Sequence, residues 1–213
     1  MGLQERCLAI LNRIEALCAP QTITLVAVSK TVPVAEIQAL YDLGHRHFGE
    51  SRLQEALPKI EALPSDIVWH FIGALQSNKA RKIAERFQVI HSLDSESAAR
   101  EIVKVSVQPE VLIEVNIKKE AQKGGILPEA LDSFMQTCVK CGEVRLKGLM
   151  TIGPAEAELE ETRRCYRRLR ELKDQHPNLS VLSMGMSQDF EVAIQEGANY
   201  IRVGTAIFGE RKN

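Results

Sequence analysis

The stretch Thr24-Leu25-Val26-Ala27-Val28-Ser29-Lys30 decides the predicted fold. Its apolar residues favour a buried strand, and Thr31-Val32-Pro33 ends that strand before a helical pattern begins. Strands that are apolar on both faces are typical of the middle of a parallel sheet. Lys30 therefore lies at the carboxyl end of the predicted sheet, where parallel α/β folds place their chemistry.

The amine of Lys30 has two interpretations. Among apolar side chains it is partly desolvated, which favours its neutral form and makes it a candidate Schiff-base nucleophile. Alternatively, Lys30 only caps the strand and extends its charge into water, as many surface lysines do. The stretch alone favours this second interpretation, and the rest of the chain changes that balance.

The composition is that of an ordinary soluble domain. The chain has 213 residues, of which 45% are hydrophobic and 26% charged, and its formal net charge is −1. This balance gives no bulk attraction to nucleic acid or to an anionic membrane, so neither is an expected partner. No apolar run approaches the roughly 18 residues of a membrane span, and the N-terminus does not resemble a signal peptide. Five cysteines fit reduced thiols, so we expect a cytoplasmic protein.

Strand and helix patterns alternate after an amphipathic helix over residues 4–18. The predicted strands are 24–30, 45–49, 67–73, 89–93, 111–116, 144–152, 179–184 and 200–204. The predicted helices are 34–43, 51–63, 76–87, 94 or 95 to 107, 128–141, 156–175, 188–197 and 206–211. Eight such units favour a closed (β/α)8 TIM barrel over an open doubly wound sheet, although such barrels usually have about 250 residues.

No change of composition and no linker divides the chain, so we predict one α/β domain over residues 1–213. No Gly-x-Gly-x-x-Gly follows the first strand, so a dinucleotide site is not expected. In barrels of this kind the phosphate of a ligand commonly binds at the loops after the seventh and eighth strands.

Those two loops have the residues that bind an anion. Gly185 and Gly204 let the backbone approach closely, Ser187 and Thr205 supply hydroxyl groups, and each loop leads into a predicted helix. The structural alternative is that Ser187 only caps a helix and Gly204 only forms a tight turn. Because the features coincide at both loops, we predict a phosphate site.

Two side chains in predicted strands are further candidates. Arg202 lies two residues before Gly204, so both point the same way from the strand, and a guanidinium there can donate to a ring nitrogen or an anion. A surface salt bridge is the alternative for Arg202. His70 is either catalytic or, as is more common for a lone histidine in an apolar strand, a hydrogen-bonded core residue.

Two other features have mainly structural interpretations. Cys138 and Cys141 have Cys-x-x-Cys spacing, but no second pair or suitably spaced histidine accompanies them, so no metal site is predicted. The basic run over residues 79–86 is typical of a solvated helix face, with a partner-binding surface as the less common alternative.

Seven segments, spread in order over nearly the whole chain, carry a family resemblance. They are Val28-Ser29-Lys30-Thr31, His47-Phe48-Gly49-Glu50-Ser51-Arg52, His70-Phe71-Ile72-Gly73-Ala74-Leu75-Gln76-Ser77-Asn78-Lys79, Glu114-Val115-Asn116-Ile117, Gly148-Leu149-Met150-Thr151, Ser183-Met184-Gly185-Met186-Ser187 and Arg202-Val203-Gly204-Thr205. In these segments the chain resembles the YggS/PROSC family of pyridoxal phosphate homeostasis proteins.

The resemblance implies both a fold and a cofactor. The fold is a barrel like the N-terminal domain of alanine racemase, without the second domain of that enzyme. The cofactor is pyridoxal 5′-phosphate (PLP), held as a Schiff base on Lys30. Ser187, Gly204 and Thr205 are implied to hold the phosphate of PLP, and Arg202 to face its pyridine nitrogen.

The resemblance also has chemical consequences. Because an arginine stays charged, Arg202 would keep the pyridine nitrogen unprotonated and so weaken PLP as an electron sink. One residue departs from the family pattern, since Ser51 stands where the Gly-Glu-Asn motif of the family usually has asparagine. A contact to PLP at Ser51 would therefore be made by a shorter hydroxyl group.

Two functions are compatible with these residues. The first is a carrier or regulator in intracellular PLP homeostasis without catalytic activity, and the second is a PLP-dependent amino-acid racemase. Racemases of this fold take a second base from an added domain and a dimer partner. The chain is too short for that domain, and its tyrosines (residues 41, 166 and 200) fall in predicted helices and strands. We therefore predict the carrier, as a monomer whose partners are PLP-dependent apoenzymes or a regulatory protein.

Overall fold

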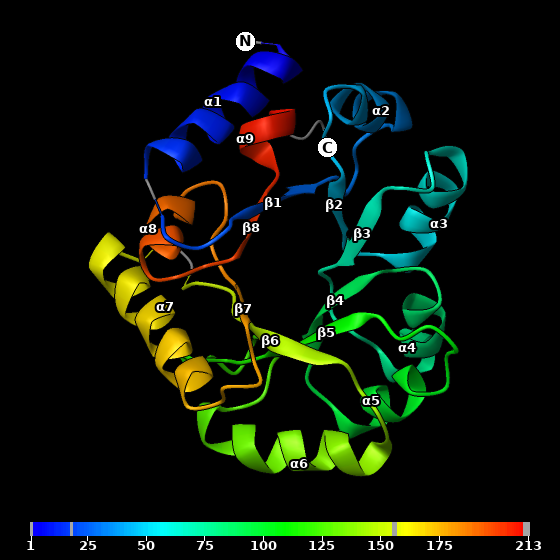
Figure 1. The fold of residues 1–213 in the computed structure, drawn as a ribbon, viewed down its shortest axis with the longest axis vertical. Coiled ribbons are helices and arrows are strands. Elements are labelled where there is room, and N and C mark those ends of the chain that lie inside the picture. Colours follow the sequence, from blue (N-terminus) through cyan, green and yellow to red (C-terminus); the bar gives the residue numbers. More distant parts are fainter. Residues whose placement is uncertain (1, 18, 155–156, 211–213) are drawn as a thin grey trace.

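The computed structural model describes residues 2–17, 19–154 and 157–210. Its strands pair in parallel, each with the next along the chain, and β8 pairs with β1 to close a barrel (Figure 1). The strands are β1 (Thr24–Val28), β2 (His47–Glu50), β3 (Val68–Phe71), β4 (Val89–Leu93), β5 (Glu110–Glu114), β6 (Leu146–Met150), β7 (Val181–Ser183) and β8 (Tyr200–Val203). The predicted (β/α)8 TIM barrel is confirmed.

Helices surround this barrel and cover its outer face (Figure 1). They are α1 (Leu3–Ala16), α2 (Val34–Asp42), α3 (Leu53–Ala62), α4 (Ser77–Ala84), α5 (Glu96–Ile102), α6 (Leu131–Cys141), α7 (Leu159–Asp174), α8 (Phe190–Gln195) and α9 (Thr205–Phe208), with the 3-10 turn η1 (Pro128–Ala130) before α6. The first and last of these helices, α1 and α9, pack against each other. None of the described helices is long and apolar enough to cross a bilayer.

Most elements are shorter than the sequence patterns predict, and the first strand shows why. β1 ends at Val28, two residues before Lys30, although the backbone N–H of Ser29 still donates to Gly49 at 2.9 Å. Thr31 then takes a φ of 64°, a left-handed conformation that turns the chain away from the sheet. The predicted ends at residues 18, 156 and 211 lie outside the described residues.

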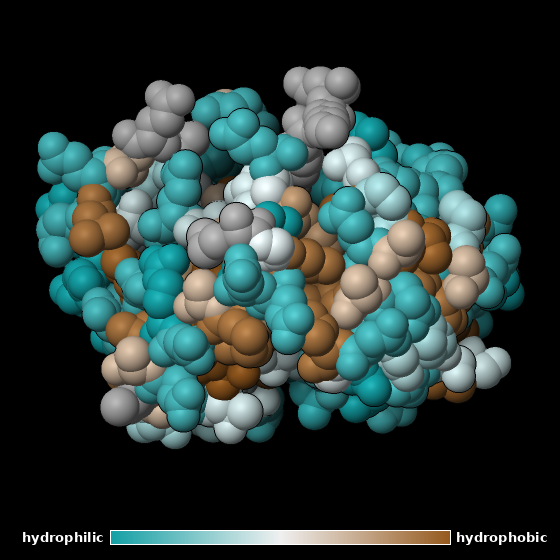
Figure 2. Space-filling model, turned by 90° about the horizontal axis from the view of Figure 1, so that it is seen from above, coloured by the Kyte–Doolittle hydropathy of each residue, from teal (hydrophilic) through white to brown (hydrophobic). Residues whose placement is uncertain are grey.

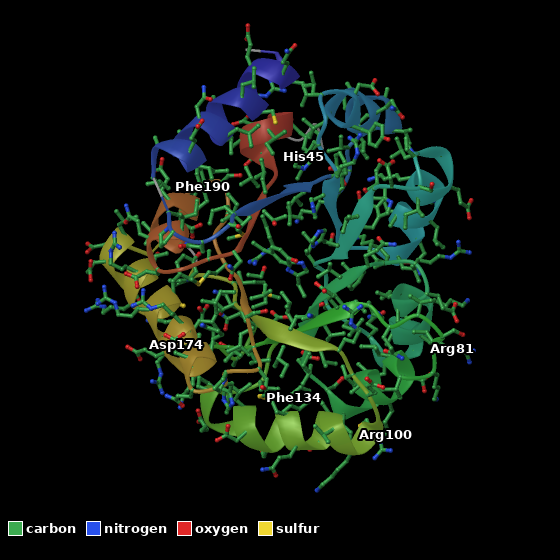
Figure 3. All side chains as sticks on the ribbon, in the orientation of Figure 1. His45, Arg81, Arg100, Phe134, Asp174 and Phe190 are labelled. Atoms are coloured by element: carbon green, nitrogen blue, oxygen red, sulfur yellow. The ribbon has the colours of Figure 1, made fainter. Side chains whose placement is uncertain are left out.

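Alternation along the strands separates two environments. Leu25 and Ala27 of β1 point outward and join the apolar core beneath the helices. The inner face carries polar residues of several strands, all of them buried: His70, His91, Ser183 and Arg202. Figure 3 shows that side chains fill the ring of strands. Since bulky apolar residues usually dominate barrel interiors, this polar column is unusual and invites a functional explanation.

On the face drawn in Figure 2, hydrophilic side chains cover much of the surface, and apolar groups show between them. The basic helix α4 belongs to the exposed outer layer, where Arg81 points away from the barrel (Figure 3). Arg81 pairs with Glu85 one helical turn further on, at 3.2 Å. This pairing fits the solvated face that the sequence predicts for residues 79–86.

Candidate functional site

A cavity of about 500 Å³ lies at the carboxyl ends of the strands. Among its lining residues are Lys30, Ser187, Arg202, Gly204 and Thr205. The structure therefore brings together five of the six predicted site residues, which come from the ends of β1, β7 and β8. TIM barrels carry their active sites at this end, where the parallel strands finish.

Lys30 enters this cavity from a tightly held loop. On one side of it, the hydroxyl group of Ser29 donates to Glu50 Oε1 at 2.6 Å. On the other side, the backbone N–H of Thr31 donates to Glu55 Oε1. The hydroxyl group of Thr31 also closes back onto the carbonyl oxygen of Lys30 at 2.6 Å. Both neighbours of Lys30 are thus fixed by carboxylates.

A buried lysine joins these two carboxylates. Lys59 Nζ donates to the carbonyl oxygen of Ser29 at 2.9 Å, to Glu50 Oε1 at 2.8 Å and to Glu55 Oε1 at 3.0 Å. The side chain of Glu50 is fully buried, so burial raises its pKa, while the hydrogen bonds from Lys59 and Ser29 oppose that rise. Lys59 therefore holds the loop that carries Lys30, although Lys59 does not line the cavity itself.

The two predicted phosphate loops meet at a pair of hydroxyl groups. Thr205 Oγ1 donates to Ser187 Oγ at 3.1 Å, and the backbone N–H of Ala206 donates to the same oxygen at 3.4 Å. Ser187 does not cap α8, because Asp189 is the residue that precedes this helix. Ser187 and Thr205 both line the cavity, where their hydroxyl groups can serve as donors for an anion.

The loop after β7 owes its shape to Gly185 and Asp189. Gly185 has a φ of +93°, and a Cβ there would lie 2.5 Å from the Cβ of Ala193, so only glycine fits. Asp189 accepts hydrogen bonds from the backbone N–H of Met186 at 2.6 Å and from the hydroxyl group of Tyr166 at 2.7 Å. These contacts hold Ser187 in place between Gly185 and Asp189.

Arg202 lies on the inner face of β8, only 6% exposed. Its Nη1 donates to Ser183 Oγ at 2.6 Å and its Nη2 to the carbonyl oxygen of Thr151 at 3.0 Å. Burial lowers the pKa of Arg202, whereas the nearby Tyr166 and Glu114 oppose that change. Arg202 is therefore a buried cation at the floor of the cavity, and not a residue of a surface salt bridge.

Glu114, to which the sequence analysis assigned no role, interacts electrostatically with Arg202, although it does not line the cavity. It is 7% exposed at the end of β5, and burial together with the neighbouring Asp94 raises its pKa to about 7, against the opposing charge of Arg202. Burial of an acid at a strand end is hard to read from sequence, because the residues around it come from other strands. The one sequence signal that could have identified Glu114 is its place in the motif Glu114-Val115-Asn116 at the end of a strand.

Two predicted residues lie elsewhere. Ser51 does not line the cavity, and its backbone carbonyl packs so closely on Gly73 that a Cβ there would lie 2.1 Å from the oxygen. His70 is fully buried below the cavity, and both of its ring nitrogens are hydrogen-bonded, as in the core-residue interpretation.

The described cysteines, Cys7, Cys138, Cys141 and Cys165, are free, whereas Cys18 lies outside the described residues. Within the described ranges, no three histidine, cysteine or acidic side chains are placed to hold a metal ion together.

Known proteins share this barrel and its sequence. The family model for the N-terminal domain of alanine racemase matches residues 9–212. The solved alanine racemase of Clostridium difficile 630 superposes with a TM-score of 0.72 over 99% of this chain and 57% of its own, at 14% identity, which shows the common fold.

Proteins that are more similar in sequence identify the family. The pyridoxal phosphate homeostasis protein of Aquifex aeolicus (strain VF5) is 43% identical over 227 aligned residues, which cover 100% of each chain. The structure of PipY from Synechococcus elongatus PCC7942 with PLP bound is 38% identical, with a TM-score of 0.84 over 98% of this chain and 100% of PipY. This chain therefore belongs to the family of pyridoxal phosphate homeostasis proteins.

Proposed function

We propose that this protein binds PLP in the 500 Å³ cavity and acts as a carrier or regulator in intracellular PLP homeostasis, without racemase activity. The observation that carries the proposal is the meeting of Lys30, the hydroxyl pair of Ser187 and Thr205, and the buried Arg202 in one cavity. The PLP bound to PipY and the name of the Aquifex aeolicus relative support it.

The donor groups of the cavity fit PLP, which supplies an aldehyde that condenses with a primary amine, a phosphate monoester and a pyridine ring. Lys30 provides the amine for a Schiff base. Ser187 and Thr205 donate hydroxyl groups to the phosphate, which approaches the backbone at Gly204. Arg202 directs its guanidinium at the pyridine nitrogen and leaves it unprotonated, so the bound ring is a poor electron sink. Ser51 is left out of this set because it does not line the cavity.

The ionisable side chains of the cavity favour a carrier over a racemase. Besides Lys30 and Arg202, the described lining contains only Lys123 and Asp189. Lys123 Nζ is held by Glu120 Oε1 at 2.7 Å and by a backbone carbonyl at 3.0 Å. Asp189 is engaged with Tyr166 and a backbone N–H. A second base opposite Lys30 would first have to leave these contacts.

The remaining parts of the proposal concern the whole protein. Residues 1–213 form one PLP-binding domain that works as a cytoplasmic monomer. PLP-dependent apoenzymes or a regulatory protein receive its cofactor or read its state. Neither nucleic acid nor a membrane is a partner, in keeping with the net charge of −1.

The test is the visible absorption spectrum of the purified protein with added PLP, beside Lys30→Ala and a matched surface variant, Lys79→Ala. We expect wild type and Lys79→Ala to show a yellow band that borohydride abolishes, with the added mass on the peptide that contains Lys30. Lys30→Ala should lack both the band and the added mass. Absence of the band from wild type would overturn the cofactor assignment.

A second measurement separates carrier from catalyst. The loaded protein is incubated with L-alanine and other L-amino acids, and D-enantiomers are measured by chiral chromatography. In parallel, it is mixed with an apoenzyme whose activity requires PLP. Transfer of PLP without racemisation is the expected result. Racemisation that disappears in Lys30→Ala would refute the carrier and establish the enzyme.

A further inference from the structure

The barrel interior holds an unbroken chain of hydrogen bonds that ends at Arg202. His47 Nδ1 lies 3.0 Å from His70 Nε2, and His70 Nδ1 lies 2.9 Å from His91 Nε2. His91 Nδ1 lies 2.8 Å from Ser183 Oγ, which accepts from Arg202 Nη1 at 2.6 Å. The chain crosses from β2 through β3, β4 and β7 to β8, so it joins residues that are far apart in sequence.

The two inner histidines of this chain are neutral. His70 and His91 are fully buried, and burial lowers the pKa of each well below its ordinary value. For His91 the positive charge of Arg202 adds to this lowering. A neutral imidazole has one donor nitrogen and one acceptor nitrogen. Since both nitrogens of each ring are engaged, every link along the chain must donate in the same direction.

Arg202 sets that direction. A guanidinium only donates, so Ser183 Oγ is the acceptor of its bond with Arg202. Among the described residues, His91 Nδ1 is the one acceptor within hydrogen-bonding distance for the proton of the Ser183 hydroxyl group. If His91 donated instead, that buried O–H would have no partner, at a cost of about 1–3 kcal/mol. Ser183 therefore donates to His91.

The remaining tautomers follow from this first step. His91 accepts at Nδ1, so its proton is on Nε2 and is donated to His70 Nδ1. His70 then has its proton on Nε2 and donates to His47 Nδ1. Each link presents its acceptor side to Arg202 and its donor side to the opposite end of the barrel, so the dipoles of the chain are aligned.

We propose that His47, His70, His91 and Ser183 are positioning residues that hold Arg202 through one oriented hydrogen-bond chain, with all three histidines in the Nε2–H tautomer. The two groups to which Arg202 donates, Ser183 Oγ and the carbonyl oxygen of Thr151, are both neutral. Aligned dipoles behind Ser183 supply negative potential to the buried cation without a carboxylate in contact. The guanidinium is thereby held as a cation at the floor of the cavity.

The far end of the chain lies at the amino ends of the strands. His47 begins β2 and lines a second cavity of about 380 Å³, together with Tyr200. The ring of Tyr200 packs on those of His70 and His91, at centroid distances of 5.4 and 5.6 Å. The polar column therefore extends from one end of the barrel to the other, with Tyr200 packed beside its middle.

The tautomers are measured directly by NMR of protein labelled with 15N in histidine, without PLP and at pH 7. The protein has five histidines in all, and single His→Gln variants identify the NMR signal of each. We expect His47, His70 and His91 to be neutral with the proton on Nε2. A proton on Nδ1 of His91, or a doubly protonated ring at any of the three positions, would overturn the proposal.

Variants test the link to Arg202. Ser183→Ala removes the connection, so we expect His91 to lose its single tautomer and bound PLP to dissociate about tenfold faster, with a shifted visible band. His91→Gln retains an acceptor and a donor and should stay within twofold of wild type, whereas His91→Leu should behave like Ser183→Ala. His176→Gln, at the surface, is the matched control. Thermal unfolding followed by circular dichroism verifies that each variant is folded.

The effect on PLP rests on the proposed function, but the tautomers do not. If wild type binds no PLP and the NMR result is as expected, the proposed function fails and the oriented chain stands. If Ser183→Ala is folded and keeps both the His91 tautomer and the visible band of wild type, the chain does not position Arg202 and the inference fails.

Discussion

Replacing Lys59 with methionine tests whether a buried ion cluster holds the loop of Lys30. The side chain of Lys59 is 8% exposed, and that of its partner Glu50 is fully buried. Methionine retains most of the apolar stem but removes the ammonium group. Removal of one partner of a buried ion pair costs about 3–5 kcal/mol, because the other charge stays buried without compensation. We expect Lys59→Met to lower the free energy of unfolding by about 3 kcal/mol at pH 8, the low end of that range, because Glu50 can bind a proton and so avoid an uncompensated buried charge.

The pH dependence of this loss has a definite sign. Burial already raises the pKa of Glu50 above its ordinary 4.5, and loss of Lys59 raises it further. Between 4.5 and that higher value, the folded variant binds a proton that the unfolded chain releases. Its stability therefore falls as the pH rises through this window, so the loss at pH 5 should be clearly smaller than at pH 8.

The assay is urea unfolding at both pH values, followed by the fluorescence of the single tryptophan, Trp69, which is buried in β3. The matched control is Arg81→Met on α4, which removes an exposed pair with Glu85 and should cost roughly 0.5 kcal/mol or less. Adding Glu50→Gln to Lys59→Met should restore part of the stability. A loss below about 1 kcal/mol at pH 8, or equal losses at both pH values, would refute the reasoning.

Two further substitutions test other parts of the fold. The pKa of Glu114 is raised to about 7 in the folded protein, against 4.5 in the unfolded chain. The free energy of unfolding of wild type should therefore fall by roughly 3 kcal/mol as the pH rises from 4.5 to 7, and Glu114→Gln should not show this fall. Urea unfolding across that pH range measures the difference. A Cβ at Gly148 would lie 1.9 Å from the carbonyl oxygen of Val181 in β7, so Gly148→Ala should lower the stability by about 3 kcal/mol. Gly44 has a φ of +94° but open space around the position of a Cβ, so Gly44→Ala should lower the stability by only about 1 kcal/mol. Urea unfolding of the two glycine variants measures both losses.

The sequence was sufficient for the barrel because its signals are local. Each strand is a short apolar run between turn residues, and each helix has its own period, so eight alternating units define the topology. Element ends were less accurate because they depend on tertiary contacts. The strand predicted to reach Lys30 ends at Val28, where hydrogen bonds from distant residues and the left-handed Thr31 take over.

The candidate site was predictable to the extent that strand ends carry it. Lys30, Ser187, Arg202, Gly204 and Thr205 follow from their places at strand ends, and they do line one cavity. The residues that hold them were not predictable, since Lys59 is an ordinary helix residue in the sequence and His91 an ordinary strand residue. Part of their importance arises from neighbours distant in the sequence: Ser29 lies 30 positions from Lys59, and Ser183 lies 92 positions from His91.

Lys30 and Arg202 are supported in opposite ways, and the difference explains what the cavity is built to do. The loop of Lys30 is held by ionic partners, Lys59 with Glu50 and Glu55, which fix the backbone on both sides of Lys30. Arg202 donates to two neutral acceptors, so no carboxylate in direct contact offsets its field at the cavity floor. A carboxylate in the place of Ser183 would neutralise that field. The neutral histidine chain that we propose would preserve it, and the proposed PLP site, in which Arg202 weakens the cofactor as an electron sink, needs that charge.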